Sequence, residues 1–209
     1  MINFLAKISN FFLFDAVTIE RKVYLRILDE NSTKTKALEG EDGERFSEIF
    51  NKYFDKVYQF FYFRLRNASD AEDLAAETFE KVLKNFHSFE ERGHGMAAWI
   101  FKIARNALSD FFRKKKFQID SIDELEPSRE PSKDFSLKDL DRDMLKEKLW
   151  EVVETLPERQ KAVWGLKLSS DLPHKEIGKI LGVSEANVNV IVHRSLTTLK
   201  QQLGHLYYE

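Results

Sequence analysis

The stretch Trp99–Lys116 constrains the fold more than any other, because its apolar residues recur at the spacing of an α-helix. These residues are Ile100, Ile103, Ala104, Ala107, Leu108 and Phe111. They fall on one helical face and predict a stripe that is buried in a core. The opposite face carries Lys102, Arg105, Ser109, Arg113 and Lys116, with Asn106 beside them. One helix therefore combines a core face with a polar, positively charged face.

The basic face of this helix suits a polyanionic partner. The run Arg113–Lys116 adds four consecutive positive charges at the end of the helix. Phosphate backbones attract such a face, and the attraction weakens as the salt concentration rises. The alternative is a solvated surface helix, since positive charge near a helix C-terminus also suits the helix dipole.

The composition favours helices and limits the classes of function. Only 8 Gly and 4 Pro occur in 209 residues, of which 33% are charged, and this argues against a many-turned sheet protein. A net charge of -2 means that any nucleic-acid binding depends on local basic patches. The absence of Cys excludes disulfides and thiolate metal sites and fits a reducing cytoplasm. No apolar run approaches the roughly 20 residues of a membrane span.

Residues 1–43 form an N-terminal extension whose role the sequence does not indicate. Met1–Val17 is apolar but interrupted by charges, and it lacks the basic start and cleavage site of a secretory signal. We therefore expect an amphipathic helix there. Thr18–Leu28 suits a strand and a helix equally well. Asn31–Glu44 is polar and contains two Gly, which is typical of a linker.

Residues 44–117 are expected to form a first helical domain. Arg45–Arg66 has an aromatic core face, and a second helix opens on a capping box formed by Ser69 and Glu72. Together with the basic helix, these two segments suffice to enclose one core. The second helix also exposes an acidic face, which suits a helix N-terminus as well as a basic partner. That face includes Asp70, Asp73 and Glu77.

The chain changes character at residue 118. Residues 118–142 are rich in Asp, Glu, Ser and Pro and predict an acidic flexible linker. Residues 143–209 are expected to form a second helical domain, in which Pro157 takes the first position of a helix. The predicted fold class is therefore all-α, with two small helical domains joined by an acidic flexible linker.

Within the second domain, His174–Leu199 has the spacing of a helix-turn-helix. Gly178 is a small residue where two helices would cross, and Gly182 suits the left-handed conformation that ends the first helix. Ser184 is placed to cap the next helix. A helix of this kind enters the DNA major groove, and a purely structural helical hairpin is the alternative. The residues expected near base edges or phosphates are Asn187, Asn189, Val190, His193 and Arg194.

Taken together, the two domains resemble the bacterial RNA polymerase sigma factors of the extracytoplasmic-function (ECF) group. The resemblance covers roughly Glu44–Lys116 and Met144–Leu203, which is most of the chain. Four motifs carry it: DAEDLAAETF at Asp70–Phe79, AWIFKIARNALSDFFRKK at Ala98–Lys115, LPERQKAV at Leu156–Val163, and EIGKILGVSEANV at Glu176–Val188, which His193 and Arg194 follow. Asn189 departs from the pattern, because basic residues are usual in the family at that position.

The resemblance implies a dissociable initiation subunit of RNA polymerase that needs no cofactor and no metal and has no catalytic activity. The first domain would bind the clamp coiled coil of the polymerase core through its acidic helix. It would also recognise and open the minus-ten promoter element, through Trp99, Lys102, Arg105, Asn106, Arg113 and Lys116. The second domain would bind the flap tip and the minus-thirty-five element. An anti-sigma factor is a further candidate partner.

Two other classes of function are alternatives to this interpretation. A one-component helix-turn-helix transcriptional regulator would act without core polymerase, and it would need neither the acidic helix nor the basic helix. A nucleic-acid enzyme would need a Gly-rich phosphate loop, clustered metal ligands or a nucleophile motif, and the sequence contains none of these. For Trp99 two roles stay open, since the ring either stacks on or shapes the pocket of an unstacked base, or lies in the core.

Overall fold

The computed structural model describes residues 41–85, 89, 95–119, 147–148 and 150–203, with the side chains of 116–119 left out. Its elements are α3 (Glu41–Leu65), α4 (Ala68–Asn85), α5 (Met96–Ile119), α7 (Glu158–Ser169), α8 (His174–Leu181) and α9 (Glu185–Leu203). The described part of the chain contains no strand, and the all-α prediction is confirmed. The predictions for the N-terminal extension up to residue 40 and for most of the acidic linker lie outside the described residues.

Helix α3 is longer than predicted, because it includes Glu41–Glu44, which the sequence had suggested as part of a linker. The first turn carries Glu41, Asp42 and Glu44, and negative charge is favourable at a helix N-terminus. The boundary predicted at residue 44 therefore falls inside a helix. The core face of α3 is aromatic, and Phe50 lies 4.8 Å from Phe79 of α4 between ring centroids.

The residue that caps helix α4 lies two positions earlier than the cap predicted at Ser69. The side-chain oxygen of Asn67 accepts a hydrogen bond from the backbone N–H of Asp70 at 2.9 Å. Arg66 turns the chain with a φ of 51°, which lets α4 start directly after α3. The prediction at Ser69 was wrong because Asn caps helices as well as Ser does, and the spacing alone did not separate them.

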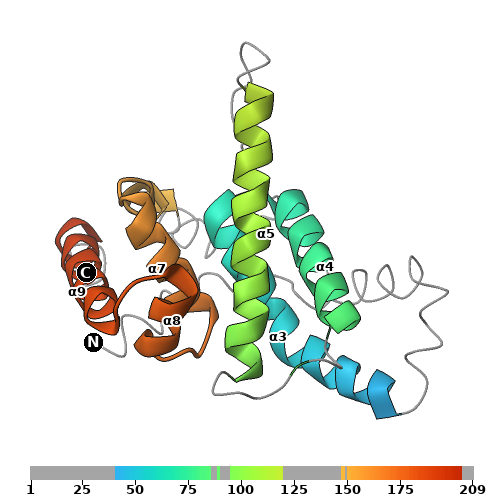
Figure 1. The fold of residues 1–209 in the computed structure, drawn as a ribbon. Coiled ribbons are helices and arrows are strands. Elements are labelled where there is room, and N and C mark those ends of the chain that lie inside the picture. Colours follow the sequence, from blue (N-terminus) through green and yellow to red (C-terminus); the bar gives the residue numbers. More distant parts are fainter. Residues whose placement is uncertain (1–40, 86–88, 90–94, 120–146, 149, 204–209) are drawn as a thin grey trace, which may run out of the picture.

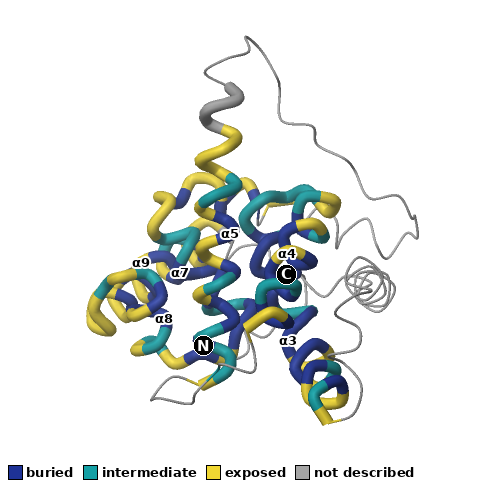
Figure 2. The backbone as a smooth tube through the Cα atoms, turned by 45° about the vertical axis from the view of Figure 1, so that its right-hand side comes forward, coloured by how far each residue is buried: buried dark blue, intermediate teal, exposed yellow. Residues whose placement is uncertain are grey.

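Helix α5 crosses both α3 and α4 and completes the first domain (Figure 1). Its buried stripe is confirmed: Ile100, Ala104, Ala107 and Leu108 are buried, and Ile103 and Phe111 pack against the core while remaining partly exposed. The C-terminal end of α5 projects beyond the other helices (Figure 1), and residues 112–115 near that end are exposed (Figure 2). That end carries the basic run of the helix.

Helices α8 and α9 form the predicted helix-turn-helix. Gly182 has the left-handed backbone (φ 68°, ψ 36°) that ends α8. A Cβ atom on Gly178 would lie 2.6 Å from the carbonyl oxygen of Val183, so only Gly fits this turn without a shift. Ser184 caps α9 by accepting the Asn187 N–H at 3.2 Å. One prediction in this domain needs correction, since Pro157 precedes α7 as its cap residue instead of taking the first helical position.

The two domains pack against each other along α3 and α7, a contact that the sequence did not predict. A Cβ on Gly165 of α7 would lie 3.2 Å from a ring carbon of Phe63 on α3, so the two helices cross closely there. Trp150, which is 1% exposed, lies 5.3 Å from Phe63 between ring centroids. We call this contact the interdomain seam; its central residues are Phe60, Phe63, Trp150 and Gly165.

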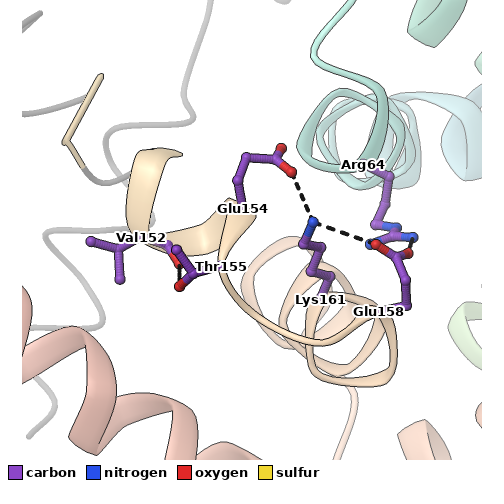
Figure 3. Close-up of polar contacts among 6 residues, drawn as sticks. All are labelled: Arg64, Val152, Glu154, Thr155, Glu158 and Lys161. Carbon is purple, nitrogen blue, oxygen red and sulfur yellow. Dashed lines mark hydrogen bonds and ion pairs between the residues drawn. The ribbon is translucent and has the colours of Figure 1, made fainter.

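Ion pairs border the interdomain seam (Figure 3). The guanidinium of Arg64, on α3, donates to Glu158 of α7 at 2.6 Å, and the Arg64 side chain is only 9% exposed. Lys161 lies between Glu154, at 2.8 Å, and Glu158, at 3.4 Å. The hydrogen bond from Arg64 lowers the pKa of the Glu158 carboxyl, which therefore stays ionised in this position.

Candidate functional site

The acidic face predicted on the second helix is present on α4. Asp73 and Glu77 are exposed one turn apart, and Asp70 is partly exposed on the turn before them. On the opposite side, Leu74 and Thr78 are buried against the core. The Glu77 carboxylate accepts a hydrogen bond from Lys81 at 2.6 Å. We call Asp70, Asp73 and Glu77 the acidic surface; it lies on a helix whose inner face is buried in the core.

The basic face predicted on α5 is also on the surface. Lys102, Arg105, Asn106 and Arg113 are exposed, and the Lys116 side chain lies outside the described residues. Arg113 pairs with Asp110 at 2.9 Å, which orients its guanidinium along the helix. We call Lys102, Arg105, Asn106 and Arg113 the basic face. Its charges are accessible, as phosphate binding requires.

A pocket of about 480 Å³ adjoins the basic face where α4 ends and α5 begins. Its lining residues are Lys81, Asn85, Phe89, Trp99, Ile103, Asn106 and Asp110. The rings of Phe89 and Trp99 lie 5.1 Å apart between centroids, at an angle of 40°. Aromatic faces, an aliphatic side chain and amide and carboxylate groups thus surround one space. We call it the aromatic pocket.

The position of Trp99 is compatible with both roles considered for it, stacking on a base and packing in the core. The ring packs against the core and is partly exposed, and it also lines the pocket. The sequence predicted Asn106 as a functional residue but missed Lys81, Asn85 and Phe89. The spacing of Ile103, Asn106 and Asp110 at helical intervals was a usable signal, whereas Phe89 lies between helices, where periodicity gives no information.

Helix α9 presents its predicted DNA-contacting residues on one outward face. Asn187, Asn189, His193 and Arg194 are exposed, and Val190 is 45% exposed. Val188, Ile191 and Ser195 are buried on the inner face, where the Ser195 hydroxyl donates to Gln160 of α7 at 2.9 Å. The Nδ1 atom of His174, the first residue of α8, contacts the side-chain oxygen of Asn189. This contact was not predicted.

The predicted residues thus form three separate surfaces. Arg105 of the basic face also lines a pocket of about 350 Å³ together with Arg64, Glu158 and Leu181. The described residues contain no group of three or more His, Cys, Asp or Glu side chains placed to hold a metal. Among the described helices, none is long and apolar enough to cross a membrane.

Comparisons with known proteins identify both domains. Residues 49–118 match the family model of sigma-70 region 2, and residues 146–199 match that of sigma-70, region 4. The two matches together span more than half of the chain. They include the acidic surface, the basic face and α9 up to residue 199.

Curated relatives agree with these matches. The ECF RNA polymerase sigma factor SigW of Bacillus subtilis is 30% identical, over 83% of this chain and 96% of SigW. The ECF RNA polymerase sigma factor BldN of Streptomyces coelicolor is 28% identical, over 78% of this chain but only 61% of BldN.

A solved structure supports the fold. The sigma factor RpoE of Bartonella quintana, in complex with the anti-sigma factor NepR, superposes with a TM-score of 0.61 at 21% identity, over 77% of this chain and 98% of that one. A one-component regulator, the alternative considered from the sequence, does not account for the region 2 match. The chain therefore belongs to the ECF group of the sigma-70 family, the RNA polymerase sigma factors that direct initiation to specific promoters.

Proposed function

We propose that the aromatic pocket of this sigma factor captures an unstacked promoter base while the adjoining basic face holds the phosphates of the minus-ten element. The observation that carries the proposal is the position of Asn106, which is exposed on the basic face and also lines the pocket. A base that leaves the duplex beside Lys102 and Arg105 would meet the pocket without a long displacement.

The chemistry of the pocket fits a base better than an aliphatic ligand. Stacking on an aromatic ring is worth about 1–3 kcal/mol per base and is available to every base. Phe89 and Trp99 supply two rings, and Asn106 and Asp110 supply hydrogen-bonding groups beside them. Amide and carboxylate groups discriminate between the edges of different bases. The pocket therefore combines affinity with selection.

We expect Trp99→Ala to abolish the contribution of one promoter base to binding. Core-bound protein would be tested on templates with a pre-melted minus-ten element, each carrying an abasic site at a different position. For the unaltered protein, one abasic site should weaken binding by about 1–3 kcal/mol. In Trp99→Ala that position should no longer matter, because the ring that stacks on the base is gone.

Two further variants keep this experiment decisive. Phe112→Ala removes an exposed ring from the same helix but outside the pocket, so it should leave the abasic profile unchanged. Asn106→Ala retains both rings and tests the pocket if Trp99→Ala destabilises the domain. Abasic profiles that are identical for all variants would refute the proposal.

We further propose that the acidic surface binds the clamp coiled coil of core polymerase. Asp73 and Glu77 lie on one exposed face of α4, so both side chains can meet a basic surface at once. Asp73→Lys/Glu77→Lys should weaken core binding at least about tenfold, because it replaces attraction by repulsion. Titration of labelled protein with core polymerase measures the affinity.

The matched control for the acidic surface is Glu44→Lys/Glu48→Lys, which reverses two exposed charges at the same spacing on α3. Exposed charges contribute little to folding, so both double variants should keep the thermal midpoint of the parent. Equal losses of affinity in the two variants would indicate a general charge effect and would remove the clamp assignment.

In the second domain, α9 is proposed to lie in the major groove of the minus-thirty-five element, since its exposed face holds Asn187, Asn189, Val190, His193 and Arg194. This domain is also proposed to bind the flap tip. The complex of RpoE with NepR supports an anti-sigma factor as a further class of partner. The protein acts through polymerase without catalysis of its own.

A further inference from the structure

The contact between His174 and Asn189 joins the two helices of the helix-turn-helix on their exposed side. His174 begins α8, Asn189 lies in the second turn of α9, and Asn189 is exposed. Their side chains meet through the His174 Nδ1 and the Asn189 Oδ1 atoms. The residue expected to read a base is therefore already held by a neighbour.

The turn between α8 and α9 fixes this contact. The Val183 N–H donates to the carbonyl oxygen of Gly178 at 2.9 Å, and Gly182 holds the left-handed conformation that this geometry requires. Ile177 of α8 and Val188 of α9 are both 0% exposed, so the two helices share a packed core. The packing of the two helices thus fixes the separation between the backbones of His174 and Asn189.

The atoms in contact determine the direction of the hydrogen bond. A side-chain amide oxygen only accepts, so the ring nitrogen of His174 must donate. The Asn189 oxygen is then engaged toward α8, and its NH₂ group remains available to the groove. An unrestrained Asn pairs with adenine by using the oxygen and the NH₂ group together. An Asn whose oxygen is turned toward α8 by one hydrogen bond faces the groove mainly with its NH₂ group, which suits the two acceptors of guanine, N7 and O6.

We propose that His174 is a positioning residue that sets the base preference of Asn189, turning an amide that would pair with adenine into a donor that favours guanine. The inference rests on the proposed function, in which α9 lies in the major groove of the upstream element. It adds a residue of the neighbouring helix to the specificity determinants.

Removal of the ring should change selectivity at one position instead of weakening all contacts. In His174→Ala the Asn189 oxygen is released and can accept from the N6 amino group of adenine. We expect the guanine-to-adenine affinity ratio at that position to fall about 5- to 10-fold, the size of one hydrogen-bonding contact to a base. His174→Gln should retain much of the preference, because its amide N–H can also donate to Asn189.

The experiment uses the full chain bound to core polymerase and a promoter library randomised over the upstream element. Enrichment of each base would be measured for the parent, His174→Ala, His174→Gln, Asn189→Ala and His174→Ala/Asn189→Ala. The proposal is supported if His174→Ala changes the base preference at the same position as Asn189→Ala. The double variant should then have the same base preference as Asn189→Ala alone. Lys175→Ala serves as the control for a phosphate contact from the same turn, since Lys175 is exposed beside His174.

The other outcomes overturn the inference in distinguishable ways. If His174→Ala weakens every sequence equally and lowers the salt dependence, as expected of Lys175→Ala, the ring contacts phosphate and does not set preference. If Asn189→Ala shifts base preference and His174→Ala does not, the inference fails while the proposed function of α9 stands. If Asn189→Ala leaves every position unchanged, the proposed function of this residue fails as well.

Discussion

Gly165→Leu is expected to separate the two domains while leaving each of them helical. A Cβ at this position already lies within 3.2 Å of Phe63 and 3.5 Å of Phe60, and both rings are buried. The larger leucine side chain has no space between α3 and α7. Forcing extra atoms into a packed contact typically destabilises it by about 1–3 kcal/mol, and this penalty falls on the docked arrangement alone.

The absence of Cys makes the measurement direct, because two introduced cysteines can be labelled without background. Ser69→Cys on α4 and Lys200→Cys on α9 are both at exposed positions. Energy transfer between dyes at these sites should fall in Gly165→Leu, and small-angle scattering should give a larger radius of gyration. Circular dichroism would report the helical content.

Gly95→Leu is the matched control, since no atom lies within 4 Å of a Cβ placed there. It makes the same substitution away from the seam and should leave the energy transfer unchanged. If Gly165→Leu is folded and retains the energy transfer and the radius of the parent, the interdomain seam contributes nothing to domain docking.

The second large effect is expected for Lys102→Ala/Arg105→Ala. Both side chains are exposed on the basic face, and each removed cation should lower the slope of the salt dependence by about 1. Core-bound protein should lose open-complex formation on a fully duplex promoter. It should recover much of this activity on a promoter with a pre-melted minus-ten bubble, because the aromatic pocket is intact and the strands are already apart.

Arg45→Ala/Lys52→Ala removes two exposed positive charges from α3 instead of α5 and should behave like the parent on both templates. Permanganate reactivity of unpaired thymines measures opening on each promoter. Normal opening by Lys102→Ala/Arg105→Ala on duplex DNA would show that the basic face is an ordinary solvated surface of the helix.

The sequence predicted those features of the fold that depend on a local pattern of residues. The stripe of α5, the left-handed turn at Gly182 and the Ser184 cap depend on residues within a few positions of each other, and all three are confirmed. The first turn of α3 was missed because polar residues with Gly resemble a linker. The cap at Asn67 was missed because Ser69 satisfied the same rule.

Such local patterns do not predict contacts between segments that are distant in the sequence. Nothing in the spacing of Trp150 and Gly165 indicates that both residues contact α3. The aromatic pocket needed Phe89, which lies outside any periodic segment. The contact between His174 and Asn189 depends on the angle between α8 and α9, and this angle cannot be predicted from residue spacing.

The interdomain seam also has a consequence for synthesis of the protein. Phe63 and Gly165 are separated by about 100 residues, and a ribosome that adds about 5–20 residues per second needs roughly 5–20 s to reach the second from the first. During this interval α3, α4 and α5 can fold, but the aromatic side of α3 that α7 later covers remains open to water. A nascent chain paused before Trp150 would therefore expose an apolar patch to which chaperones bind. The chaperone would dissociate once α7 has been synthesised and covers that patch.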